Sequence, residues 1–252
     1  MLTIRKEQFQ EFKQNALKSF EQEMLIHLKN YAPELFHIRG KCCFLEVIMA
    51  GIRRAEYYKF SNCGPTRLYI ESMFTLGFDF DTDPQFPWAA TILKKTDKTH
   101  QMIIADQLYR AIHKYLNECM GYNNEHMILA LKKFNCSDQL FNEISSIYYT
   151  ESLLALLNHL YPEKFDYVGK KQLTILIHEG NRIAEQYCIL NAQEKALFVV
   201  LMYAFGYGIL NDPLYPWIKN VFENKQIKQS AGRMNRLYNK TKLYVKEIMN
   251  NL

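Results

Sequence analysis

Apolar residues recur every three or four positions along most of this chain, which is the spacing of amphipathic helices. Residues 8–31 carry the first such stripe, and Pro33 ends it. No segment alternates Val, Ile and Thr with the two-residue period of a strand, so the pattern predicts an all-α protein. Further helices are expected over residues 41–60, 65–77, 88–93 and 99–120.

One segment of the pattern occurs twice. Residues 73–88 and 202–217 match without a gap at an offset of 129, and both tryptophans of the protein fall in these segments. Weaker matches continue on either side, which predicts a duplicated helical unit. The pairs in register are Met73/Met202, Gly77/Gly206, Asp83/Asp212, Pro84/Pro213, Pro87/Pro216 and Trp88/Trp217.

The duplication predicts how the chain is divided. We expect a first helical repeat over residues 1–120, a helical linker over 121–147 and a second repeat over 148–252. Solenoid repeats have periods of roughly 20–50 residues, so this long period indicates two units packed about a pseudo-twofold axis. The shared face is expected to be hydrophobic, with neither unit stable alone. Within the linker region, Ser137 or Asp138 is the expected N-cap of the next helix.

The repeated motif Asp-Pro-x-x-Pro-Trp has a structural explanation. Its Asp can accept hydrogen bonds from the next turn, the first Pro fixes φ, the second Pro limits the chain before a helix, and Trp fills the space beneath. Because both halves of one molecule retain the motif, it is interpreted as a requirement of each unit rather than as one active site. The predicted structural residues are Asp83, Pro84, Pro87, Trp88, Asp212, Pro213, Pro216 and Trp217.

A second repeated motif, Gly-x-Arg-x-Ala-Glu-x-Tyr, begins at Gly51 and recurs 129 residues later. It places Arg53 three residues before Glu56, and Arg182 three residues before Glu185, on one helical face. We interpret each pair as a surface or interface ion pair. The alternative is a twinned anion site, since Arg is the preferred fork for anions.

Three aspartates, Asp79, Asp81 and Asp83, resemble the start of a calcium loop. An EF-hand needs Gly at the sixth position and Glu at the twelfth, where this chain has Pro84 and Ala90. We therefore expect a solvated acidic loop in which Asp83 acts as a cap. No other spacing of His, Cys or acidic residues predicts a catalytic set, a metal site or a cofactor.

Composition and charge exclude only a few classes of function. The formal net charge of +5 favours an acidic partner but is too small to predict nucleic-acid binding. The basic face of the last helix, with Arg233, Arg236 and Lys240, is interpreted as solvated. The six cysteines form no CxxC pair, the first residues contain no apolar export segment, and no apolar run reaches the roughly 18 residues of a membrane span. These features predict a cytoplasmic protein with free thiols.

The first half of the chain resembles a family of small bacterial proteins that are often encoded beside type VI secretion components. Three patterns carry the resemblance, and it covers residue 4 to about residue 93. They are Ile-Arg-x-Glu-Gln from Ile4, Gly-Ile-x-x-Ala-x-x-Tyr from Gly51, and a segment from Met73 that ends in Asp-Pro-x-x-Pro-Trp-Ala. The resemblance implies an accessory role near secreted effectors and supplies no catalytic residues.

Our leading hypothesis is a non-enzymatic binding protein that serves as adaptor, chaperone or immunity partner of a secreted effector encoded nearby. One alternative is a self-associating structural module that uses the linker region, residues 123–149, as its interface. The other is an enzyme with a pocket between the two repeats, using polar residues present in only one of them. The candidates for that role are Asp79, Asp81, Glu46 and His178.

Overall fold

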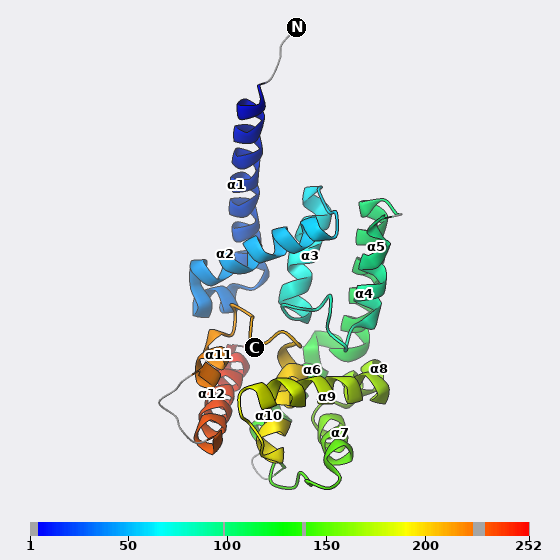
Figure 1. Cartoon of the computed structure of the whole chain (residues 1–252), viewed down its shortest axis with the longest axis vertical. Coiled ribbons are helices and arrows are strands. Elements are labelled where there is room, and N and C mark those ends of the chain that lie inside the picture. Colours follow the sequence, from blue (N-terminus) through cyan, green and yellow to red (C-terminus); the bar gives the residue numbers. More distant parts are fainter. Residues whose placement is uncertain (1–4, 98, 138–139, 224–229, 252) are drawn as a thin grey trace.

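The computed structural model describes residues 5–97, 99–137, 140–223 and 230–251. Every regular element in this part of the chain is helical, which confirms the all-α prediction (Figure 1). None of the described helices combines the length and the apolar composition needed to cross a bilayer.

The first unit contains α1 (Lys6–Tyr31), α2 (Pro33–Tyr57), α3 (Cys63–Leu76), α4 (Pro87–Leu93), the 3₁₀ helix η1 (Lys94–Asp97) and α5 (Gln101–Cys119). The linker holds the 3₁₀ helix η2 (Tyr122–Asn124) and α6 (Glu125–Asn135), and the second unit contains α7 (Tyr149–Leu160), α8 (Pro162–Val168), α9 (Lys170–Gln186), α10 (Ala192–Phe205), α11 (Pro216–Glu223) and α12 (Ser230–Asn251).

The helices of the second unit repeat those of the first at the offset of 129 seen in the sequence. For example, α3 and α10 correspond at both ends, and α4 and α11 both begin at the second Pro of the repeated motif. The long helix α2 is bent at Gly40, where φ is 75°. At the matching position, Gly169 with φ of 81° separates α8 from α9. The order and bounds of these helices agree with the duplication, which stays a prediction.

Two expectations about helix ends are wrong. α2 begins at Pro33 and not at residue 41, because Pro33 starts the next helix as its first residue and only Ala32 separates it from α1. Ser137 does not cap a following helix. Its hydroxyl donates to the carbonyl oxygen of Phe134 at 2.6 Å, at the end of α6. Asp138, the other expected cap, lies outside the described residues.

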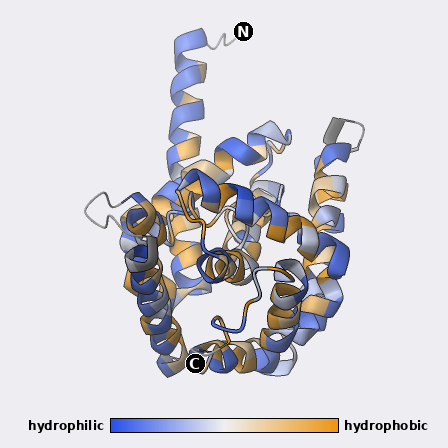
Figure 2. Cartoon of the chain, turned by 60° about the horizontal axis from the view of Figure 1, so that its bottom comes forward, coloured by the Kyte–Doolittle hydropathy of each residue, from blue (hydrophilic) through white to orange (hydrophobic). Residues whose placement is uncertain are grey.

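Each unit has its own cluster of buried apolar side chains, with hydrophobic faces turned mainly inwards (Figure 2). The linker side chains Phe134, Phe141 and Ile144 belong to the core of the second unit. Leu214, from the second unit, is buried in the core of the first. The two cores are thus joined by side chains that cross between the units, while the division into residues 1–120, 121–147 and 148–252 stays a prediction.

Candidate binding site between the two repeats

The two copies of the repeated segment meet where α3 and α10 end. Gly77 and Gly206 end these helices with φ of 109° and 105°. A β-carbon on Gly77 would lie 2.9 Å from Cα of Gly206 and 2.8 Å from the carbonyl oxygen of Phe205, so the two backbones touch. Residues at equivalent positions contact each other here, as a twofold axis would require. These contacts support the pseudo-twofold packing, which stays a prediction.

The motif aspartates connect the two units through backbone N–H groups. We call the loop between α3 and α4 the first corner and the loop between α10 and α11 the second corner. Asp83 accepts hydrogen bonds from the N–H of Gln85 at 2.8 Å, within its own corner, and from the N–H of Tyr207 at 2.9 Å, in the other unit. Asp212 likewise accepts from the N–H of Leu214 at 2.8 Å, and the backbone N–H of Phe78, in the first unit, favours its charged form and so lowers its pKa. Each motif aspartate therefore shapes its own corner and interacts with the backbone of the opposite one.

A buried lysine lies beside the first of these carboxylates. Lys164, on α8 of the second unit, is 4% exposed and donates a hydrogen bond to the carbonyl oxygen of Tyr203. Its Nζ lies 5.8 Å from the ring centre of Phe86 in the first unit. Burial lowers the pKa of Lys164 to about 8, and the charge of Asp83 opposes that change. Burial also raises the pKa of Asp83 to about 6, although the hydrogen bonds from Gln85 and Tyr207 and the charge of Lys164 lower it.

An arginine occupies the corresponding place beside the second carboxylate. Arg39, on α2 of the first unit, lies over the rings of Tyr215 and Tyr244 of the second, 5.9 and 5.1 Å from their centres. Burial raises the pKa of Asp212 to about 7, the Asp79 charge adds to this rise, and the Arg39 charge opposes it. The pKa of each motif aspartate is thus lowered by the charge of a cation from the other unit. These cations stand at non-equivalent positions of the repeat, so internal comparison of the sequence did not reveal them.

The three aspartates of the first corner do not form the solvated loop that we expected. Asp81 is 7% exposed and accepts hydrogen bonds from the hydroxyls of Tyr58 at 3.0 Å and Tyr69 at 2.8 Å. Arg54 forms an ion pair with Asp79 and also lies 3.7 Å from Asp81. Both carboxylates therefore have partners within the protein. The second unit replaces this polar set as a group, with Ile183, Phe198, Gly208 and Leu210 where the first has Arg54, Tyr69, Asp79 and Asp81.

One of these replacements is required by the contact between units. A β-carbon on Gly208 would lie 2.0 Å from a carboxylate oxygen of Asp79, its equivalent in the first unit. Two aspartates therefore do not fit at this place. In the described residues, no group of three or more His, Cys, Asp or Glu side chains is placed to hold a metal ion.

The motif tryptophans pack at the edges of the corners. Trp88 and Trp217 are both half-buried, while Phe86, two residues before Trp88, is 1% exposed. The Trp88 ring centre lies 5.8 Å from that of Phe86, and the Trp217 ring centre lies 6.2 Å from that of Tyr244. The expectation that the indoles fill the space beneath the corners is therefore met only in part, since Phe86 takes the most buried place.

The second repeated motif does not form the expected pairs. Arg182 pairs with Glu179 at 2.8 Å, one turn earlier on α9, and Glu185 pairs with Lys195 of α10 at 2.6 Å. Arg53 and Glu56 are exposed, and neither has an ion pair within the described part of the chain. The glycine that both copies of this motif retain has a clear structural role. Cβ atoms on Gly51 and Gly180 would lie 2.6 and 2.7 Å from side chains of α3 and α10, so both positions need the close approach of the next helix.

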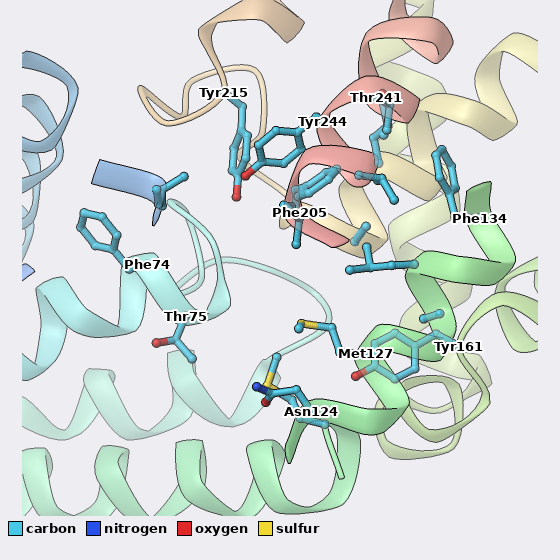
Figure 3. Close-up of a pocket in the computed structure, with 18 of the residues that line it drawn as sticks. Phe74, Thr75, Asn124, Met127, Phe134, Tyr161, Phe205, Tyr215, Thr241 and Tyr244 are labelled. Atoms are coloured by element: carbon cyan, nitrogen blue, oxygen red, sulfur yellow. The ribbon is translucent and has the colours of Figure 1, made fainter. Parts of the chain in front are cut away.

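A cavity of about 680 Å³ lies between the units (Figure 3). Equivalent residues of both repeats line it, among them Phe74 with Tyr203 and Thr75 with Ala204. Helix α6 of the linker, which has no counterpart, supplies a further wall with Met127 and Phe134. Other lining residues include Tyr31, Leu35, Leu116, Met120, Asn124, Ala130, Leu131, Tyr161, Phe205, Tyr215, Thr241 and Tyr244.

The wall of this cavity is mainly apolar, because its hydroxyl groups bond to other protein atoms. Tyr161 donates to the carbonyl oxygen of Cys119 at 2.9 Å, and Tyr203 donates to the carbonyl oxygen of Tyr161 at 2.9 Å. The hydroxyls of Tyr31 and Thr75 bond to each other at 2.8 Å. Among the described lining residues, Glu34 is the only one with a carboxylate, and none is His, Cys, Lys or Arg.

The polar residues considered for an enzyme pocket lie elsewhere. Asp79 and Asp81 are bound by Arg54 at the first corner, and Glu46 and His178 are exposed on α2 and α9. None of the four lines the cavity. An apolar wall without a pair of acid and base groups is suited to binding an apolar group. The apolar spacing within α6, at positions 127, 130, 131 and 134, was the sequence signal for this wall.

No protein-family model matches the chain, and neither the curated proteins nor the solved structures compared with it contain a match.

Proposed function

We propose that this chain is a non-enzymatic binding protein of the bacterial cytoplasm, acting as adaptor, chaperone or immunity partner of a type VI secretion effector. The observation that carries the proposal is the apolar cavity between the repeats. Its volume of about 680 Å³ lies within the roughly 300–1,000 Å³ of ligand pockets. Two further features support the proposal: the resemblance of residues 4–93 to proteins encoded beside secretion components, and six free cysteines, as in a reducing compartment.

The chemistry of the wall indicates what would enter the cavity. Aromatic side chains and the two methionines Met120 and Met127 surround it, and methionine adapts its shape to different apolar groups. A helix of a partner protein that inserts large apolar side chains into a hydrophobic groove is a common mode of recognition. We therefore propose that an apolar helical segment of the effector occupies the space between α3, α6, α10 and α12.

Co-expression with the product of the adjacent effector gene, followed by size-exclusion chromatography, tests this proposal. Ala204 is exposed and lines the cavity, so Ala204→Glu introduces a charge there without entering the core. We expect this variant to lose co-elution. Ala155→Glu is the matched control, because Ala155 is an exposed helical alanine outside the cavity, and it should co-elute as the unchanged protein does. Absence of any complex, or full binding by Ala204→Glu, contradicts the proposal.

A further inference from the structure

The guanidinium of Arg39 has two buried nitrogens, Nε and Nη2, that have no hydrogen-bond partner within the described part of the chain. Among the described side chains, only Arg39 has two such atoms. Both nitrogens are donors that share a positive charge, and a buried charged donor without an acceptor is destabilising. Asp212, whose pKa the Arg39 charge lowers, supplies no acceptor to either nitrogen. This unsatisfied pair indicates an acceptor supplied by a ligand.

Arg39 stands at the end of the cavity wall that α2 provides. Leu35 and Ile38 line the cavity, and Arg39 follows Ile38 directly and lies one turn beyond Leu35, so it continues the same face of the helix. Its guanidinium lies over the rings of Tyr215 and Tyr244, which both line the cavity. Figure 3 shows these two rings at one edge of the cavity. The unpaired donors are therefore next to the cavity, although Arg39 is not itself one of the lining residues.

The helical unit does not need an arginine at this position. The equivalent residue of the second unit is Val168, which is buried in the core of that unit. Stacking on Tyr215 and Tyr244 accounts for the face of the Arg39 guanidinium. It leaves unused the edge that carries Nε and Nη2.

We propose that the ligand of the cavity carries a carboxylate, which Arg39 binds through Nε and Nη2. These two nitrogens form one edge of the guanidinium, and such an edge matches the two oxygens of a carboxylate. The rest of the ligand is apolar, because none of the described lining residues is His, Cys, Lys or Arg. A phosphate matches less well, since it would bring up to about two negative charges to a single cation.

This inference rests on the proposed function, in which an apolar helical segment of the effector enters the cavity. The carboxylate then belongs to an Asp or Glu beside the apolar residues of that segment. A free long-chain carboxylic acid has the same chemistry, so the experiments below separate the two sources. Because water does not reach Nε or Nη2, an incoming carboxylate has to turn the ring of Tyr215 or Tyr244 aside.

Isothermal titration with decanoate and with decanol tests the site without the effector. The two probes have the same apolar chain and differ in the carboxylate, which is ionised at about pH 8. We expect the unchanged protein to bind decanoate at least about tenfold more tightly than decanol, and Arg39→Met to lose this preference. Arg53→Met removes an exposed arginine of the same helix outside the cavity and should keep the preference. Failure to bind decanoate, equal binding of both probes, or a preference that survives Arg39→Met overturns the inference.

Decanol also shows whether Arg39→Met keeps its cavity, because decanol needs only the apolar wall. If this variant binds neither probe, Arg39→Lys takes its place, since lysine keeps the charge but has no planar fork. A preference for decanoate that is undiminished in Arg39→Lys then overturns the inference.

Co-elution with the effector separates this inference from the proposed function. If a segment of the effector supplies the carboxylate, both Ala204→Glu and Arg39→Met should weaken the complex. Loss of co-elution in Ala204→Glu but not in Arg39→Met contradicts the inference and leaves the proposed function standing. If no complex forms and Arg39 still sets the preference for decanoate, the proposed function fails and the ligand is a free long-chain acid.

Discussion

The carboxylate of Asp83 accepts a hydrogen bond from the backbone N–H of Tyr207 at 2.9 Å, and this bond joins the two repeats. At the equivalent positions, the backbone N–H of Phe78 favours the charged form of Asp212 and so lowers its pKa. The motif aspartate thus shapes its own corner and also connects it to the corner of the other unit. This dual role explains why both copies of the motif keep their aspartate.

Removing this acceptor should destabilise the whole protein. Asp83→Ala leaves the N–H groups of Gln85 and Tyr207 without their acceptor and removes the negative charge that favours the charged form of Lys164. We expect a loss of about 1–3 kcal/mol in the free energy of unfolding for each N–H left without an acceptor, measured by chemical denaturation. Asp106→Ala is the control, because the Asp106 side chain is 54% exposed, and it should cost less than about 0.5 kcal/mol. Equal effects of the two substitutions contradict the role of Asp83.

Stability should depend on pH through Asp212. Burial raises its pKa from 3.8 to about 7, so between these values the folded state binds more protons than the unfolded state. The contribution of Asp212 to stability is therefore complete below about pH 4 and is lost as the pH rises to about 7, by at most about 1.4 kcal/mol per pH unit. Asp212→Asn removes this titration.

The difference in unfolding free energy between the unchanged protein and Asp212→Asn isolates the effect, because other titrating groups cancel. It should fall steadily from pH 4 to pH 7, with denaturation curves recorded at each half unit. A difference that is independent of pH, or one that rises over this range, is inconsistent with a buried carboxylate whose pKa is raised.

The contact between Gly77 and Gly206 should tolerate no side chain. Gly77→Ala combines an unfavourable φ of 109° with a β-carbon 2.8 Å from a carbonyl oxygen. It should therefore lower the free energy of unfolding by well over the roughly 1–2 kcal/mol that φ strain alone would cost. Gly40→Ala measures that strain by itself, because φ is 75° there and no atom lies within 4 Å. Thermal melts should rank Gly77→Ala below Gly40→Ala, and the reverse order refutes a close contact between units.

The polar network of the first corner should be replaceable as a set. Arg54→Ile alone leaves Asp79 and Asp81 without their cation and should cost about 1–3 kcal/mol, a value reduced because the Arg54 side chain is 31% exposed. The fourfold change Arg54→Ile/Tyr69→Phe/Asp79→Gly/Asp81→Leu copies the second unit and should cost less than Arg54→Ile. If the fourfold variant loses as much unfolding free energy in denaturation experiments as the sum of its separate substitutions, this coupling is contradicted.

Much of the helical plan was predictable because it depends on local pattern. The stripe of residues 8–31, the break at Pro33 and the offset between Trp88 and Trp217 are all properties of neighbouring or repeated residues. The same comparison of repeats also identified Asp83 and Asp212 as structural positions. The bend at Gly40 was not recognised, because one glycine can bend a helix without ending it.

Contacts between the units were not predictable from that pattern. Lys164 and Arg39 supply similar cations from different positions, since the residues equivalent to them are Leu35 and Val168. Asp81 is buried near Arg54, which lies 27 positions earlier in the chain and looks like a surface residue of a helix. The cavity likewise forms only when both repeats and α6 pack together, so the apolar spacing of α6 alone does not predict it.

Unfolding observed separately through the two tryptophans tests most directly whether the repeats form one body. Trp217→Phe leaves Trp88 as the only indole and a probe of the first unit, and Trp88→Phe leaves Trp217 as a probe of the second. Because the corners bind each other, the fluorescence transition of each variant should coincide with the loss of its own helical circular dichroism, in one cooperative step. Fluorescence that changes at a denaturant concentration clearly different from the helical transition, in either variant, would show that the units unfold independently and contradict the account.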